Sequence, residues 1–134
     1  MKIVLDSNII VAAYAGRGIC NSLFELCLDR YIVIISEFIL SEVQKALHDK
    51  LKIPQKKVKI IIDYLKEFCI VSAYTKITEN ICRDKNDNDI IALAISNEVD
   101  YLITGDNDLL ILKKYKHVKI ISPREFWLII KENK

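Results

Sequence analysis

The chain has 134 residues, of which 51% are hydrophobic, and its formal net charge is +2. This length and hydrophobic content suit one folded domain with a sizeable core and exclude an intrinsically disordered chain. The near-neutral charge by itself favours neither a nucleic acid nor a membrane surface as the partner. We expect no membrane span, because no apolar run approaches the roughly 20 residues that a span requires. The opening MKIVLD becomes acidic too early for a signal peptide.

The four cysteines have no CxxC spacing, and their neighbours are apolar. A structural zinc site needs clustered ligands, so this pattern argues against one. The cysteines are instead typical of small core residues in a reducing cytoplasm. We therefore predict a cytoplasmic protein.

Short apolar runs alternate along the chain with longer stretches of helical periodicity, which is typical of βαβ units that build a parallel sheet flanked by helices. Strands this apolar are expected to be buried on both faces. The pattern therefore predicts one α/β domain over residues 1–134. In chain order we predict a strand at 2–5, a helix that begins near Ile9, a helix at 21–29, a strand at 31–35, a helix that is capped by Ser36 and runs to about His48, a helix after Pro54, a strand at 68–71, a helix at 88–97, a strand at 101–104, a helix from Asp108, a strand at 118–121 and a last helix capped by Ser122, with Glu125 in capping-box register.

Carboxylates follow two of the predicted strands directly. Asp6 comes after the first strand, and Asp106 follows the fourth after Gly105. Ligands of open α/β sheets bind at the carboxyl ends of the strands, so both positions favour a functional role. Two alternatives stay open: Asp6 caps the helix near Ile9, and Asp108 caps the helix that it opens.

Glu42 lies on the predicted apolar face of the helix in SEFILSEVQKAL. It stands four residues after Phe38 and four before Ala46, on the same stripe as Ile39, Val43 and Leu47. An ionised carboxylate on a buried face is costly unless it is paired or bound to a metal. Glu42 is therefore a candidate metal ligand, and a buried salt bridge to a lysine or arginine is the alternative.

Three aspartates precede the apolar helix of CRDKNDNDIIALAI. One of them is expected to cap that helix, and another to favour its N-terminal dipole. We assign the functional role to Asp87, which would face the sheet at the helix start. We expect Asp84 and Asp89 to be solvated or to support the site from outside.

Several carboxylates cannot remain ionised side by side without a counter-charge. A hard divalent cation supplies that charge, and oxygen ligands favour Mg²⁺ or Mn²⁺ over zinc. Such an ion can stabilise negative charge on a phosphoryl oxygen and activate water. The chain contains neither a GxxxxGK[ST] nor a GxGxxG loop, so the sequence does not support nucleotide binding by a P-loop.

The stretches IVLDSNIIVAA, SEFILSEV, CRDKNDNDIIALAI and DYLITGDNDLL, in this order and spacing, resemble the PIN domain family. The ending IISPREFWLII is similar to the VapC-like group of toxin–antitoxin systems. The resemblance covers essentially the whole chain. It implies a three-layer α/β/α fold with a central, mostly parallel sheet, here of five strands, in which strand one lies beside strand four.

The resemblance also implies a set of site residues. The acidic tetrad of the family falls on Asp6, Glu42, Asp87 and Asp106, and Asp108 matches a further acid. Ser7 and Asn8 match the polar pair after the first aspartate, and we expect them to support the ligands together with Thr104. Family members often have RDP where this chain has Arg83-Asp84-Lys85, which leaves Asp84 and Asp89 as alternatives to Asp87.

PIN domains are ribonucleases, so the resemblance implies Mg²⁺- or Mn²⁺-dependent hydrolysis of RNA that leaves a 5′-phosphate and a 3′-hydroxyl. Because carboxylates repel RNA, basic residues must attract it, and Arg17 and Lys85 are the candidates. A solvated helix face explains Lys56, Lys57 and Lys59 better. Single-stranded or loop RNA is the favoured substrate, because its bases are accessible. The resemblance further implies a cognate antitoxin and a homodimer.

Two other functions remain as alternatives. A PIN-like module could hold RNA or a protein without cutting, although a retired site would tolerate loss of the acids that this chain retains. A phosphoacceptor signalling domain also places acids around Mg²⁺ at strand ends, but FCIVSAYTK lacks the acceptor aspartate that its middle strand would need.

Overall fold

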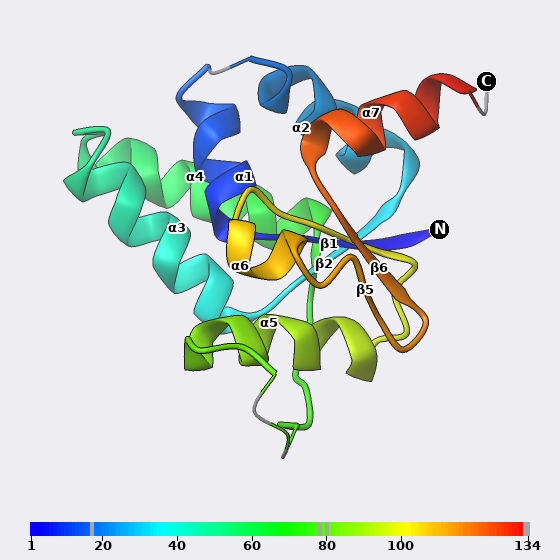
Figure 1. The fold of residues 1–134 in the computed structure, drawn as a ribbon. Helices are drawn as coiled ribbons and strands as arrows, with labels where there is room; N and C mark the ends of the chain where they lie inside the picture. The colour runs from blue at the N-terminus through cyan, green and yellow to red at the C-terminus, as the bar shows by residue number, and fades with distance from the viewer. Residues whose placement is uncertain (17, 78, 80, 133–134) are drawn as a thin grey trace.

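The computed structural model of the chain describes residues 1–16, 18–77, 79 and 81–132. A single sheet lies at its centre, with the strand order β3-β2-β1-β4-β6-β5 (Figure 1). All neighbouring strands are parallel except β5 and β6. The strands are β1 (Lys2–Leu5), β2 (Ile32–Ile35), β3 (Ile70–Val71), β4 (Tyr101–Ile103), β5 (Lys114–Tyr115) and β6 (Val118–Ile121).

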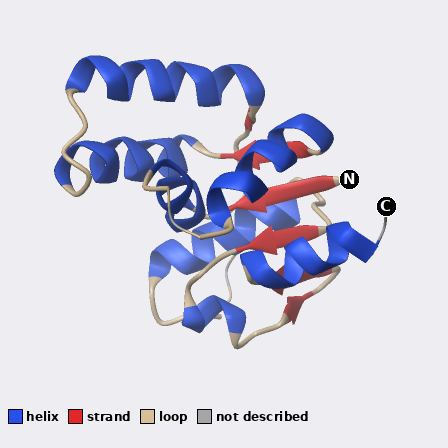
Figure 2. Cartoon of the chain, turned by 90° about the horizontal axis from the view of Figure 1, so that it is seen from above, coloured by secondary structure: helices blue, strands red, loops and turns tan. Residues whose placement is uncertain are grey.

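Helices cover both faces of the sheet. In Figure 1, α5 lies on one side, while α1, α2 and α7 lie on the other. Helices α3 and α4 form an antiparallel pair that extends beyond the sheet (Figure 2). The helices are α1 (Ser7–Tyr14), α2 (Cys20–Arg30), α3 (Glu37–Asp49), α4 (Gln55–Phe68), α5 (Lys85–Ser96), α6 (Asn107–Leu110) and α7 (Pro123–Glu132). The predicted α/β architecture with a mostly parallel central sheet is confirmed.

The sheet is buried on both faces, as the apolar strands require. Ile3, Val4 and Leu5 of β1 are fully buried, and so are Leu102 and Ile103 of β4. Removing these side chains from water supplies the main driving force for the layered arrangement. The two strands therefore form a rigid base for the residues that follow them.

Helix α7 is anchored through one aromatic side chain. Phe126 is fully buried and lies 5.7 Å from the ring of Tyr31 and 5.4 Å from that of Tyr101. Ser122 and Glu125 form the predicted capping box, since the Ser122 Oγ accepts from the Glu125 N–H and the Glu125 carboxylate accepts from the Ser122 N–H.

The prediction for the segment after Asp108 is wrong in two respects. The helix there is a single turn that ends at Leu110, and Lys114–Tyr115 form an additional strand, so the sheet has six strands rather than five. Four consecutive apolar residues, 109–112, define no helix face. Lys113 has a positive φ of 61°, which turns the chain back toward the exposed edge of β6.

No helix in the described parts of the chain is both long enough and apolar enough to cross a membrane. All four cysteines are free; Cys27 and Cys69 are buried, and Cys20 and Cys82 are partly buried. The expectation that cysteines contribute to the core therefore holds fully for the first pair.

Candidate functional site

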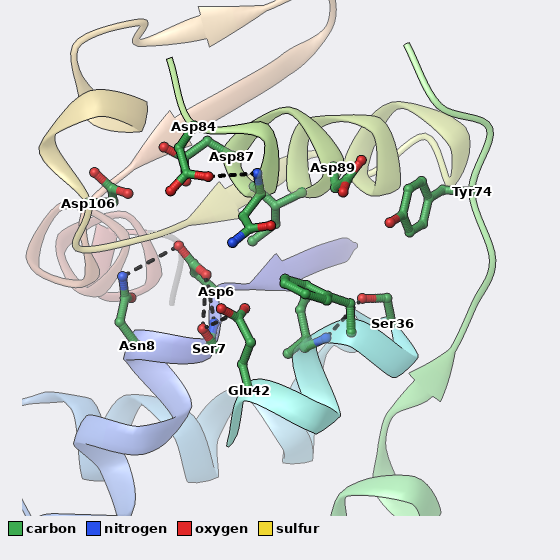
Figure 3. Close-up of a pocket in the computed structure, with 14 residues that line it drawn as sticks. Asp6, Ser7, Asn8, Ser36, Glu42, Tyr74, Asp84, Asp87, Asp89 and Asp106 are labelled. Atoms are coloured by element: carbon green, nitrogen blue, oxygen red, sulfur yellow. Dashed lines mark hydrogen bonds between the residues drawn. The ribbon is translucent and has the colours of Figure 1, made fainter. Parts of the chain in front are cut away.

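The parallel pairing of β1 with β4 places Asp6 beside the residues that follow β4. Leu5 is the register partner of Ile103, and the Asp6 N–H continues the ladder by donating to the Ile103 carbonyl at 3.0 Å. Asp6 and Asp106 therefore face the same pocket at the carboxyl ends of the two strands (Figure 3). The expectation that strands one and four are neighbours is confirmed.

Thr104 connects the two aspartates. Its side chain is fully buried, and its hydroxyl donates to Asp6 Oδ2 at 2.7 Å. The Thr104 hydroxyl oxygen also accepts from the Asp106 N–H at 3.0 Å. One buried hydroxyl thus fixes the Asp6 carboxylate and the backbone of Asp106 together.

Asp6 also caps α1, as the alternative reading proposed. Its Oδ1 accepts from the Ser7 N–H at 2.7 Å, and the Asn8 amide donates to Oδ2 at 3.4 Å. The side-chain amide oxygen of Asn8, Oδ1, in turn accepts from the Gly105 N–H at 3.3 Å, which joins the start of α1 to the end of β4. Capping fixes the direction of the Asp6 carboxylate and is compatible with its exposure to the pocket.

Glu42 reaches the same pocket from α3. The Ser7 hydroxyl lies between it and Asp6, 3.3 Å from Glu42 Oε1 and 3.5 Å from Asp6 Oδ1. Among the described residues, the ion pairs join Lys59 to Asp63 and Arg83 to Asp108. The alternative of a buried salt bridge at Glu42 therefore has no support there.

The apolar face predicted for α3 needs one correction. Ile39, Val43 and Leu47 are buried, but Phe38 is 39% exposed. Glu42, four residues after Phe38, is half-buried. Both side chains lie at the edge of the apolar face, where it borders the pocket, rather than in its centre.

Helix α5 brings a fourth carboxylate into the pocket, that of Asp87. It begins three residues earlier than predicted, because Asp84 caps it by accepting from the Asn86 N–H at 2.9 Å. Asp87 then falls in the first turn, is only 8% exposed and lines the pocket. Asp84 and Asp89 line the same pocket from more exposed positions.

The predicted capping role of Asp108 is wrong. Asp106 caps α6, because its extended backbone leaves its Oδ1 2.9 Å from the Asp108 N–H. Asp108 lies in the first turn of α6 and accepts two hydrogen bonds from one nitrogen of the Arg83 guanidinium, at 3.1 and 3.3 Å. Carboxylate oxygens of Asp87, Asp106 and Asp108 nevertheless lie within 4.8 Å of one another.

The electrostatics of the pocket are dominated by negative charge. Six carboxylates line it, and its described lining includes no lysine or arginine. Burial, followed by repulsion from Asp106 and Asp84, raises the pKa of Asp87 to about 7. Burial also raises the pKa of Asp6, despite hydrogen bonds from Thr104 and Ser7 that lower it. The pKa of Glu42 is raised by burial and by the nearby charges of Asp6 and Asp84.

This donor set fits a hard divalent cation. All candidate ligand atoms are carboxylate oxygens, the ligands that Mg²⁺ and Mn²⁺ favour, and no histidine or cysteine lines the described pocket. A cation would also offset both the burial and the repulsion that raise the three pKa values. Asp6, Glu42, Asp87 and Asp106 are the residues positioned to hold it.

The structure supports the predicted RNA-binding role of the basic residues less clearly than it supports the convergence of the acids. Arg17 lies outside the described residues. Lys85 is exposed at the first position of α5, next to Asp84. Lys56 and Lys57 are exposed on α4, and Lys59 pairs with Asp63, as expected for a solvated face.

The sequence did not indicate several of the residues that line the pocket, and Phe38, Tyr74 and Asn86 are examples. Phe38 was assigned to the core, although its spacing from Glu42 already placed it on the same stripe. Tyr74 and Asn86 also line the pocket. Tyr74 follows a short edge strand, and nothing in the sequence indicates that this segment turns toward α5.

Comparisons with known proteins agree with this geometry. A family profile described as PIN domain matches residues 2–108. An uncharacterised protein of Methanocaldococcus jannaschii is 32% identical over 139 residues, covering 94% of this chain and 89% of that protein.

Two solved structures share the fold. One is VapBC2 from Rickettsia felis bound to a DNA fragment from their promoter, with a TM-score of 0.62 and 17% identity over 91% of this chain and 98% of that chain. The other is a protein from Pyrobaculum aerophilum, with a TM-score of 0.65 and 13% identity over 98% of this chain and 90% of that one. At these identities the likeness concerns the fold alone.

Replacement of Thr104 by valine should lower the free energy of unfolding by about 1–3 kcal/mol, because a buried hydroxyl that satisfies two partners is lost. Chemical denaturation at pH 7 measures this change. Thr75→Val, at an exposed position, should change stability by less than about 0.5 kcal/mol. Equal effects of the two substitutions would contradict the bridging role.

The stability of the metal-free protein should fall as the pH rises from about 4 to about 7. The pKa of Asp87 is raised from its usual 3.8 to about 7, so the folded state binds this proton more tightly than the unfolded state does. The stabilisation is full at acid pH and is lost as the pH passes through the folded-state pKa. The raised pKa values of Asp6 and Glu42 act in the same direction.

Asp87→Asn should therefore weaken the dependence of stability on pH. Asp29→Asn, at an exposed position on α2, should leave that dependence unchanged. Melting temperatures in EDTA over this pH range provide the measurement. A slope as steep in Asp87→Asn as in the wild type would refute the assignment to Asp87.

Proposed function

Because this chain belongs to the PIN domain family, we propose that it is a metal-dependent endoribonuclease that hydrolyses phosphodiester bonds of RNA. The observation that carries the proposal is the convergence of six carboxylates on one pocket with no described lysine or arginine in its lining. In a purely structural cluster, lysine or arginine side chains would pair with the carboxylates, because unpaired buried carboxylates destabilise a fold.

We assign metal binding to Asp6, Glu42, Asp87 and Asp106, with Asp108 as a further ligand once it leaves Arg83. Mg²⁺ or Mn²⁺ bound there would neutralise the carboxylates, activate water and stabilise charge on a phosphoryl oxygen. Thr104 holds Asp6 and Asp106 in register, and Ser7 does the same for Asp6 and Glu42. Because burial and repulsion raise the pKa of Asp87 to about 7, cation binding there would compete with protonation near neutral pH.

Substrate binding requires positive charge near these acids. Lys85 stands beside Asp84 at the start of α5 and is exposed, so it can contact an RNA phosphate next to the one in the pocket. Arg17, in the AGRG segment, is proposed for the same task from the sequence alone. Single-stranded RNA or loops fit best, because their backbone can enter a pocket.

We further propose that the protein is the toxin of a type II toxin–antitoxin pair in the cytoplasm. The fold is shared with a chain of a VapBC complex. A hollow of about 360 Å³ adjoins the acidic pocket through Ser7, Asn8 and Glu42. The other residues that line this hollow are mostly apolar and come from two segments, α1 with the residue after it and the end of α3 with the residues after it. They are Val11, Ala12, Ala15, Ala46, Lys50 and Leu51. An antitoxin segment bound there would block access to the acids. The expected homodimer stays a prediction.

Asp6→Asn should reduce Mg²⁺- or Mn²⁺-dependent cleavage of single-stranded RNA by at least about 100-fold, because a cation ligand is lost. Its melting temperature without metal should equal or exceed that of the wild type, since one repelling charge is removed. Asp29→Asn serves as the matched control and should cleave normally.

Undiminished cleavage by purified Asp6→Asn would exclude the proposed site. If the wild type binds Mn²⁺ but cuts no member of a broad RNA panel, the chain is instead a non-catalytic PIN-like binding module.

Ala12→Arg should prevent inhibition by the antitoxin, because a long charged side chain would fill the hollow beside the acids. The test requires a small reading frame adjacent to that of the chain; each variant is co-expressed with the protein it encodes, and copurification and RNA cleavage are measured. Ile60→Arg, on α4 at a residue that is 68% exposed, should bind and be inhibited like the wild type. Full inhibition of Ala12→Arg would place the antitoxin elsewhere.

A further inference from the structure

The acidic pocket has a second end whose chemistry is different. Beyond the carboxylates, it is lined by Phe38, Ile39, Tyr74 and Ile90. Figure 3 shows Asp106 at one end and Tyr74 at the other, with Glu42 and Asp89 between them. Cation binding by the acids leaves this aromatic end without a role.

Phe38 differs from the other three phenylalanines of the chain. Phe24, Phe68 and Phe126 each pack against a tyrosine ring at centroid distances of 5.7 Å or less. In the described part of the chain, Phe38 has no such ring partner, and it is 39% exposed. An exposed ring without a partner, at the wall of a polar pocket, is suited to contact a ligand.

The position of Phe38 is fixed by the start of α3. Ser36 is buried and caps the helix by accepting from the Ile39 N–H at 3.1 Å. Ile39, the next residue along the helix, is buried in the core. Phe38 is therefore held by two ordered neighbours while its own ring borders the pocket.

Tyr74 supplies a second ring from the segment after β3. It is half-buried, and none of the ring pairs or cation–π contacts within the described residues includes it. A shallower hollow, lined by Ser36, Phe38, Ala73 and Tyr74 among others, lies against the same two rings. Both rings are therefore accessible at the boundary between two depressions.

We propose that Phe38 and Tyr74 bind an unstacked RNA base next to the phosphate held at the carboxylates, an inference that rests on the proposed ribonuclease function. Aromatic side chains stack on any base, because every base has a π-face. A phosphate is a poor occupant of this end, since Asp89 lies beside Tyr74 and contributes to the raised pKa of its hydroxyl.

Stacking would explain how an acidic pocket holds a polyanion with few cationic contacts. It would also restrict the enzyme to single-stranded RNA, since paired bases are not free to leave their stack. The subsite should select the strandedness of RNA more strongly than its sequence.

The test measures binding of a fluorescent single-stranded oligonucleotide by anisotropy, in Ca²⁺ and with its integrity checked by gel, alongside single-turnover cleavage in Mg²⁺. Phe38→Ala and Tyr74→Ala should each weaken binding by about 5- to 150-fold. Phe68→Ala, at a residue that is 49% exposed on α4, is the matched control and should bind like the wild type. Tyr74→Phe should retain affinity, because the ring and not the hydroxyl is used.

A scan of abasic sites along the oligonucleotide identifies the contact. The wild type should lose affinity when one particular base is removed, and Phe38→Ala should be insensitive to that removal. An equal abasic loss in both proteins, or unchanged binding by Phe38→Ala, would overturn the stacking site. If Tyr74→Phe binds as weakly as Tyr74→Ala, stacking on Tyr74 is also refuted.

Two controls separate this inference from the proposed function. The Mn²⁺-induced increase in melting temperature should be the same for Phe38→Ala and the wild type, which shows that the variant is folded and that its acids are intact. A wild type that neither cuts nor binds RNA would refute the ribonuclease proposal itself. If the wild type cuts RNA and Phe38→Ala cuts it at the same rate, only the stacking site is refuted.

Discussion

Repulsion among carboxylates at the carboxyl ends of β1 and β4 is the constraint on which the rest of this structure depends. Asp6, Asp87 and Asp106 share one pocket with Glu42, and the pKa values of Asp6, Asp87 and Glu42 are raised by burial and by neighbouring charge. Such a cluster costs stability in the absence of a cation. The fold withstands this cost because fully buried residues of β1 and β4 lie beneath it. The destabilised site is the expected signature of function rather than of packing.

The surrounding polar residues keep these charges apart and in fixed orientations. Thr104 joins Asp6 to Asp106, Ser7 joins Asp6 to Glu42, and Asn8 ties α1 to Gly105. Each contact is local to a strand end or a helix start, so the same hydrogen bonds that begin a helix also orient a candidate ligand. Family membership and the chemistry of the pocket therefore both support the proposal of a metal-dependent function.

Much of the architecture followed from the sequence, because buried parallel strands are continuous apolar runs and the helix caps at Ser36 and Ser122 are explicit. The convergence of Asp6 and Asp106 followed from strand order, which required the family resemblance. The errors have physical causes. Residues 109–112 are all apolar and so define no apolar face of a helix, which is why the sequence did not predict the single-turn α6 and strand β5. Phe38 was placed in the core because periodicity cannot tell the edge of an apolar face from its centre, and Tyr74 reaches the pocket through tertiary packing alone.

The central claim is that these carboxylates share a divalent cation. The most direct test is a crystal soaked in Mn²⁺, with anomalous difference density collected for the metal. We expect a peak inside the pocket at about 2.0–2.3 Å from carboxylate oxygens of Asp6 and Asp106, with Glu42 and Asp87 bound directly or through water. A pocket without an anomalous peak at saturating Mn²⁺, or a peak only outside it, would contradict the account.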